Sequence, residues 1–235
     1  MASEGIRFPN ESPEYRSARQ ALLDSEIQLR RQIEEVAARR RALPLGGRVR
    51  EDYVFEEGGR DLDDLETRRE VRLSELFAPG KDTLILYSYM FSPAMSQPCT
   101  SCTSILDGLD GEAPHVTQRV NLAVVAKSPV ERIRAVARER GWRNLRLLSS
   151  AGNSYNTDYG AENPKGSQLP ALNVFVRRPD GIYHFYNTEL LYAPPDPGQN
   201  SRHVDLIWPL WNLFDYTPEG RGTDWYPRLS YPPAG

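Results

Sequence analysis

The hydrophobic and polar residues of the N-terminal segment follow a helical pattern. Apolar side chains recur every seven residues, at Tyr15, Leu22, Leu29, Val36 and Leu43. Charged residues fill most of the positions between them, so the pattern predicts an amphipathic helix from Pro13 to about Leu43 with one narrow apolar stripe. Pro44 and the Gly46-Gly47 pair end it. The stripe can dock on its own chain, which is the simpler arrangement, or pair with a second copy.

From residue 48 onward, short apolar runs alternate with helical stretches. Strands are predicted for residues 48–56, 83–91, 120–127, 145–148, 171–177 and 182–187. Helices are predicted for residues 103–109, 115–119 and 128–140, with Ser128 as a capping residue, and a charged, exposed excursion for residues 60–72. This order indicates an α/β fold with a mainly parallel central sheet and helices on both faces.

Several apolar stretches are expected to contribute to the core. The run over 83–91 is almost continuously apolar, as expected for a central strand covered on both faces. The last two strands, joined by Pro179-Asp180-Gly181, form a β-hairpin, and Trp208 and Trp211 are most simply core residues on one helix face. We therefore divide the chain into an arm and helix (1–47), a main domain (48–220) and a proline-rich tail (221–235).

Composition and charge restrict the partners of the chain. It has 235 residues and a formal net charge of -3, which gives no electrostatic argument for nucleic acid or a membrane as a partner. No stretch approaches the roughly 18 consecutive apolar residues of a membrane helix, and the N-terminus lacks the apolar core of a signal peptide. We therefore expect a cytoplasmic protein, in which a cysteine pair is more often catalytic or metal-binding than a structural disulfide.

Cys99 and Cys102 are the only cysteines and follow the central strand. Two cysteines three apart at a strand-to-helix junction are a redox signature in an alternating chain. A helix N-terminus stabilises a thiolate, so the pKa of Cys99 is expected below its ordinary value of about 8.5. Cys99 is then the exposed nucleophile, and Cys102, one turn into the helix, resolves the mixed disulfide. The predicted function is thiol–disulfide exchange between a protein or small-molecule disulfide and a reductant, with no cofactor.

Other interpretations of the pair remain open. The two thiolates could form half of a metal site, although His115, His184 and His203 form no spaced pair that would complete it. They could also be inert core residues, since free cysteine is often buried. From another class of function, the chain could be a non-catalytic binding or scaffold protein that uses its N-terminal helix as the interaction surface.

A polar loop at residues 149–160 follows the strand predicted for residues 145–148. Loops in this position often line binding sites, so Tyr155 and Asp158 are candidate substrate-binding residues. The alternative is a self-bonded turn built on Asn153, Asn156 and Asp158.

Several short motifs together resemble one known family. They are Asp52-Tyr-Val-Phe55, Tyr87-Ser-Tyr-Met-Phe91, Cys99-Thr-Ser-Cys102, Ser154-Tyr-Asn-Thr-Asp-Tyr159 and Val174-Phe-Val176 with Tyr183-His-Phe-Tyr186. Over residues 15–220 the chain is similar to the bacterial family called domain of unknown function 899, which is described as thioredoxin-like and as predicted dithiol–disulfide oxidoreductases. The resemblance implies a thioredoxin-like α/β fold of the larger, peroxiredoxin-related type: a central mixed sheet flanked by helices, here with an added N-terminal helix.

The resemblance also implies a role for Pro170, which directly precedes a strand. In thioredoxin-like proteins a cis proline at this place positions an extended substrate against the active-site cysteines, although most X–Pro bonds are trans. Thioredoxin itself has Trp-Cys-Gly-Pro-Cys, whereas Gln97-Pro98 and Thr100-Ser101 surround the pair here. These residues are expected to set how oxidising the pair is. A peroxiredoxin-type Pro-x-x-x-Thr/Ser-x-x-Cys motif is matched only in part, so peroxide reduction is a minor hypothesis.

Overall fold

The computed structural model describes residues 6–231, which fall into two compact units divided between Pro44 and Leu45. The first unit is built on helix α1 (Pro13–Arg41). Its start is fixed by Ser12, whose Oγ accepts a hydrogen bond from the Tyr15 amide at 3.1 Å, and by a proline at the first helical position. The predicted helix is therefore confirmed, and none of its residues is buried.

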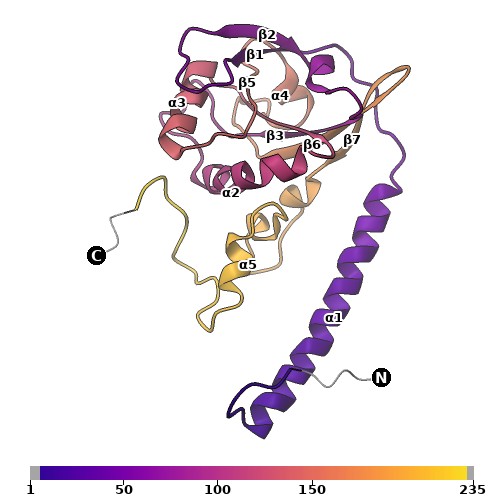
Figure 1. Ribbon diagram of the computed structural model, residues 1–235, viewed down its shortest axis with the longest axis vertical. Coiled ribbons are helices and arrows are strands. Elements are labelled where there is room, and N and C mark those ends of the chain that lie inside the picture. The colour runs from indigo at the N-terminus through magenta and orange to yellow at the C-terminus, as the bar shows by residue number, and fades with distance from the viewer. Residues whose placement is uncertain (1–5, 232–235) are drawn as a thin grey trace. The chain divides into compact units, whose positions relative to one another are not determined.

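The second unit alternates strands and helices (Figure 1). Its strands are β1 (Val54–Gly58), β2 (Arg68–Arg72), β3 (Thr83–Ser88), β4 (Asn121–Ala126), β5 (Leu147–Ser149), β6 (Ala171–Arg178) and β7 (Gly181–Asn187). Its α-helices are α2 (Thr100–Val116), α3 (Val130–Arg140), α4 (Tyr155–Asp158) and α5 (Leu210–Phe214), and its 3₁₀ turns are η1 (Leu73–Leu76), η2 (Glu189–Tyr192) and η3 (Ser201–Val204). No helix among the described residues is long and apolar enough to cross a membrane.

The strands of residues 45–231 form one mixed sheet in the order β2-β1-β5-β4-β3-β6-β7. The three central strands, β5, β4 and β3, run parallel, and every other pairing is antiparallel. The expectation of a mainly parallel sheet is therefore wrong for the flanks of the sheet. The parallel centre follows from the helical crossovers α2 and α3, because parallel neighbours need a long connection.

The two faces of the sheet carry separate apolar clusters. Side chains alternate along a strand, so Tyr87 and Tyr89 face one cluster while Leu84 and Leu86 face the other. The first cluster is covered by α2 and α3, which lie along the same face of the sheet in Figure 1. The second is covered by residues of η1 and α4. Both faces of β3 are thus buried, as its apolar sequence predicted.

The structure corrects several predicted elements. Helix α2 runs through Gly108 and Gly111 to Val116, so the break expected there and the separate helix at 115–119 are wrong. Residues 68–72, expected as an excursion, form the edge strand β2, whose charged sequence buries only Val71. Pro129, not Ser128, takes the cap position of α3, and the loop at 149–160 contains the short helix α4. Tertiary pairing and packing decided these cases over local signals.

Candidate active site

The cysteine pair lies where β3 passes into α2, at the junction that the sequence predicted. Cys99 is the N-cap residue of α2, and Cys102 lies in the first turn. Cys99 is half-buried, whereas the Cys102 side chain is completely buried in the cluster beneath α2, and both thiols are free. One sulfur is therefore accessible from solvent and the other only through its neighbour.

The backbone of Cys99 is held by three hydrogen bonds. Its amide donates to the carbonyl of Met90 at 3.1 Å, which ties the helix start to the end of the β3 segment. Its carbonyl accepts from the Thr103 amide at 3.0 Å and from Thr103 Oγ1 at 2.9 Å. Since the Thr103 hydroxyl uses its only proton there, the Tyr89 hydroxyl, 2.7 Å away, donates to it. This network fixes the position of Cys99 before any substrate arrives.

The loop that precedes Cys99 is clamped by one arginine from α3. The guanidinium of Arg132 lies 4.5 Å from the ring centre of Phe91 and donates to the carbonyls of Pro93 at 3.2 Å and Met95 at 2.6 Å. Pro98, next to Cys99, is itself buried. The loop is thus held by side-chain and ring contacts rather than by regular secondary structure.

The environment favours a thiolate at Cys99. A hydrogen bond from the Cys102 thiol is the largest influence and lowers the pKa of Cys99, to about 6. Burial opposes this effect, while the amides of Cys102 and Ser101 and the charge of Arg202 act with it. The expectation of a lowered pKa at the helix N-terminus agrees with these contacts. A thiol with this pKa is mainly ionised at neutral pH.

Cys102 has the opposite character. Complete burial raises its pKa well above the ordinary value, and the neighbouring Cys99 thiolate raises it further. The two sulfurs therefore differ in charge: the half-buried Cys99 is deprotonated, and the buried Cys102 keeps its proton and donates the hydrogen bond.

A buried arginine and a tyrosine stand behind Cys102. Arg202 Nη2 lies 3.9 Å from Cys102 Sγ and 3.5 Å from Tyr87 Oη. Nη1 of Arg202 forms an ion pair with Asp205 at 3.6 Å, and the Arg202 side chain is only 12% exposed. The Nε and Nη1 atoms of Arg202 have no hydrogen-bond partner within residues 6–231. Its charge lowers the pKa of both cysteines.

Pro170 adjoins Ala171, which pairs with Ser88 at the end of β3. It directly precedes β6, which pairs with β3, and it is half-buried. Its carbonyl accepts a hydrogen bond from the Tyr192 hydroxyl. Burial raises the pKa of Tyr192 to about 12, and the charges of Arg202 and Cys102 also act on it. The peptide bonds of the described residues are all trans, including that before Pro170.

Tyr155 and Asp158 lie on the other face of the sheet from Cys102. Tyr155 is fully buried in the second cluster, at 5.8 Å between ring centres from Tyr53. Asp158 is exposed and accepts hydrogen bonds from Ser154 Oγ and from the Tyr53 hydroxyl, both at 2.7 Å. The Tyr155 amide donates to the Asn153 side chain at 3.0 Å. The structure thus separates Tyr155 and Asp158 from the cysteine pair, and their contacts are those of a turn that bonds to itself and to Tyr53.

The model of a family of bacterial proteins of unknown function, DUF899, matches residues 7–231. The chain belongs to this family. The resemblance noted on its motifs is confirmed over almost the whole sequence. No curated protein matches this DUF899 chain as a relative.

Solved structures similar to this DUF899 chain include several peroxiredoxins. The reduced 2-Cys peroxiredoxin of Plasmodium vivax is 19% identical, with a TM-score of 0.44, and the alignment covers 61% of this chain and 83% of that one. AhpC of Enterococcus faecalis is 13% identical, with a TM-score of 0.45, over 66% and 83%. A peroxiredoxin-like protein of Aquifex aeolicus is 15% identical, with a TM-score of 0.43, over 62% and 75%. The predicted α/β class, a mixed central sheet flanked by helices, is confirmed by the strand order and the helices between the strands.

Sequence reasoning missed Arg202, Tyr87 and Tyr192. Tyr87 could have been found, because alternation along β3 places it on the same face as Tyr89, toward the helix that carries the cysteines. Arg202 and Tyr192 come from 3₁₀ turns late in the chain, and no spacing in the sequence connects them to residue 102. The metal-site alternative requires further ligands, and residues 6–231 contain no group of three or more His, Cys, Asp or Glu side chains that could hold a metal ion.

Proposed function

We propose that this DUF899 protein is a dithiol–disulfide oxidoreductase, with Cys99 as the nucleophile and Cys102 as the resolving thiol. The observation that carries the proposal is the contrast within the pair: Cys99 is accessible with a pKa of about 6, and Cys102 is buried with a pKa well above the ordinary value. This contrast fits a nucleophile with a resolving thiol better than it fits two inert core cysteines.

The chemistry requires only the two sulfurs and a disulfide substrate. The Cys99 thiolate attacks one sulfur of the substrate, a mixed disulfide forms and the first substrate thiolate leaves. Cys102 then loses its proton to the departing sulfur and attacks Cys99, which releases the second substrate thiol and leaves a Cys99–Cys102 disulfide. Two electrons have passed to the substrate, and an external dithiol reductant restores the pair. No cofactor takes part in these steps.

Arg202 is suited to the second step. Cys102 must become a thiolate inside an apolar cluster, where a bare negative charge is costly. The guanidinium at 3.9 Å offers the opposite charge directly beside the buried sulfur. Arg202 thus acts on the reaction through Cys102, as a positioning residue.

We expect Pro170 to contact the substrate, because it directly precedes β6 and its carbonyl is bonded to Tyr192, on whose pKa the charge of Cys102 acts. A substrate strand lying there would meet a proline without an amide donor and a carbonyl already bonded to Tyr192. The substrate would therefore be held by its contact with the proline ring and by neighbouring main-chain groups rather than by that carbonyl.

Turnover of a model disulfide tests the proposal. With dithiothreitol as reductant and a fluorescent glutathione disulfide as substrate, the wild-type protein should turn over catalytically. Cys99→Ser should lose at least about a hundredfold of the rate, because no thiolate is left to attack. Cys102→Ser should accumulate a mixed disulfide on Cys99, visible as an added glutathione by mass spectrometry. Equal rates for wild type and Cys99→Ser would contradict the proposal.

A further inference from the structure

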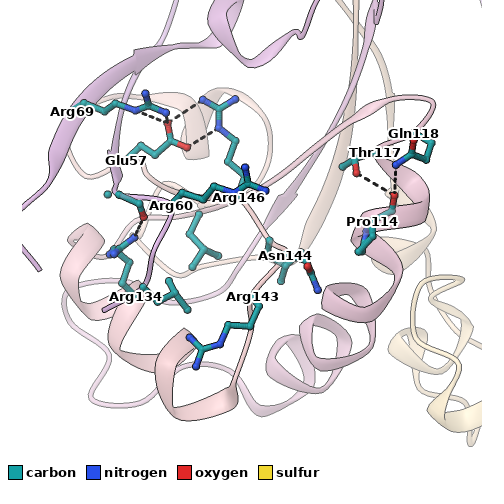
Figure 2. A pocket seen from close by; sticks show the side chains of 15 residues that line it. Glu57, Arg60, Arg69, Pro114, Thr117, Gln118, Arg134, Arg143, Asn144 and Arg146 are labelled. Carbon is teal, nitrogen blue, oxygen red and sulfur yellow. Dashed lines mark hydrogen bonds and ion pairs between the residues drawn. The ribbon is translucent and has the colours of Figure 1, made fainter. Parts of the chain in front are cut away.

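A cavity of about 530 Å³ lies away from the cysteines, at the opposite end of α2. It is bounded by the last residues of β1, the C-terminal end of α2, the start of β5 and one side chain of α3 (Figure 2). Cys99 caps the first turn of the 17-residue helix α2, and Pro114 and Thr117 at its other end border the cavity. At about 1.5 Å per residue the helix separates the two places by roughly 25 Å.

The lining is strongly basic. Among the described residues around the cavity there are five arginines and a single carboxylate, Glu57. The charges therefore differ by four in favour of the positive sign. A concave surface with such an excess attracts anions and concentrates the field within the cavity.

Three of the arginines are already used by the protein. Figure 2 shows Glu57 between Arg69 and Arg146, which donate to it at 3.0 Å and at 2.7 and 2.9 Å. Arg134 is buried and bonds the carbonyls of Gly59, Asp61 and Asp64, which holds the 59–64 loop at the rim. These contacts give the Glu57 carboxylate and three of the five guanidinium groups a structural role.

The other two arginines have no such explanation. The guanidinium groups of Arg60 and Arg143 make no hydrogen bond or ion pair within the part of the chain that the structure describes, and both residues are exposed. No dashed line reaches either side chain in Figure 2. Each offers a planar fork of five donors, the geometry that binds phosphate or carboxylate oxygens in pairs. Two unpaired guanidinium groups therefore border one cavity, and the single carboxylate of that cavity is already bonded to other arginines.

The cavity also has an apolar side. Leu62 and Leu147 are buried residues whose side chains border it, and Leu145 and Pro114 add to this surface. A cavity of this volume accommodates a small metabolite rather than a macromolecule. The chemistry that fits both parts is an anionic head on an organic body.

We propose that this cavity binds a small organic phosphate, with Arg60 and Arg143 contacting the phosphate and the leucine side receiving the organic body. A phosphate monoester or diphosphate carries about two or more negative charges at neutral pH, which matches two unpaired guanidinium groups better than a single carboxylate does. The site is separate from the cysteine chemistry, because within residues 6–231 no hydrogen bond or ion pair joins a lining residue to Cys99 or Cys102.

Calorimetric titration of the full-length reduced protein at about 0.15 M salt tests the proposal. The probes are ADP, pyrophosphate and citrate. ADP should bind, pyrophosphate should bind more weakly because it lacks the organic body, and citrate should bind weakest. Arg60→Ala and Arg143→Ala should each weaken ADP binding about tenfold or more, as loss of a charge-assisted fork predicts.

Arg178→Ala is the matched control. It removes an exposed arginine at the β6–β7 end of the sheet, far along the strand order from β1 and β5, and should change ADP affinity less than about twofold, which is the effect of net charge alone. Thermal unfolding of the three variants should match the wild type, since none of the guanidinium groups bonds to another element. Absence of ADP binding at about 5 mM, equal affinity for citrate, or unchanged affinity in Arg60→Ala and Arg143→Ala would each overturn the proposal.

Discussion

The pKa values of the two cysteines differ because their environments differ. Single substitutions can measure what each neighbouring group contributes. The hydrogen bond from the Cys102 thiol is the largest influence on the Cys99 pKa. Serine keeps a donor at position 102 and alanine removes it. We therefore expect the alkylation rate of Cys99 to rise with pH with a midpoint of about 6 in the wild type, close to that value in Cys102→Ser, and nearer the ordinary value of about 8.5 in Cys102→Ala.

The measurement is the rate of iodoacetamide labelling from pH 4 to 10, with Cys99→Ser as the blank. The sign follows from the lowered pKa: Cys99 is a thiolate above pH 6 and becomes an unreactive thiol below it. The same midpoint in the serine and alanine variants would show that the helix amides, not Cys102, hold the pKa down.

Arg202 is expected to govern the lifetime of the mixed disulfide. Replacing Arg202 by methionine removes the positive charge at 3.9 Å from Cys102 Sγ, so the pKa of Cys102 should rise further and its attack on Cys99 should slow about tenfold. Arg202→Lys keeps the charge and should restore much of the rate. Quenched mass spectrometry of the glutathione adduct follows this step directly. Wild-type lifetimes in Arg202→Met would refute the role.

Residue-scale prediction from the sequence succeeded where the signal was local. Cys99 and Cys102 could be placed at a strand-to-helix junction because the apolar run and the spacing of three are contiguous. Arg202 could not, because it reaches Cys102 from a hundred residues away through a 3₁₀ turn that no periodicity marks. Tyr155 was selected for lying in a polar loop, yet packing places it in the core, since a loop's polarity says nothing of which face its aromatic residue takes.

At the scale of elements, α2 is longer than its sequence suggests, because the helix continues through two glycines. A side-chain carbon added at Gly108 would meet no atom within 4 Å. Gly108→Ala should therefore stabilise the protein by about 0.5–1 kcal/mol, because alanine loses less backbone entropy in a helix. The free energy of unfolding from urea titration provides the measurement.

Gly141 is the matched control for that substitution. It also has no atom within 4 Å of an added carbon, but its φ is +76°, in the left-handed cap of α3. Gly141→Ala should destabilise by about 1 kcal/mol, since only the backbone conformation differs between the two sites. Effects of equal sign at the two glycines would show that the argument from conformation fails.

Glycine residues and charged residues also explain why the full length of α2 and the strand β2 were not predicted from the sequence. Gly108 and Gly111 suggested a helix end, but the buried face of α2 continues beyond Gly108 at Asp110 and Ala113. The strand β2 has one buried residue among charged ones, so it depends on pairing with β1 rather than on its own pattern. Long apolar runs such as that of β3 were predictable because burial on both faces leaves a strong signal.

At the scale of the whole molecule, the question is what covers the apolar stripe of α1. Leu22 and Leu29 are 53% and 58% exposed, and a repeat of seven residues is the interval at which two helices wrap around each other. We therefore expect the full-length chain to form a homodimer through α1 and residues 45–235 to be monomeric. Because α1 buries no residue, the shortened chain should melt within about 3 °C of a monomeric full-length variant.

A pair of substitutions separates the stripe from the rest of the helix. Leu29→Glu places a charge in the stripe, whereas Ala38→Glu adds the same charge about 200° away around the helix from Val36, outside it. Light scattering after gel filtration should give a monomer mass for Leu29→Glu and a dimer mass for Ala38→Glu, because only the first charge would be buried between two helices. A monomeric wild type, or a dimer that survives both the Leu29→Glu change and the loss of residues 1–44, would show that α1 is not the dimer interface. Loss of the dimer with unchanged disulfide turnover would place the helix outside the redox chemistry and leave the cysteine pair as a property of the 45–235 unit alone.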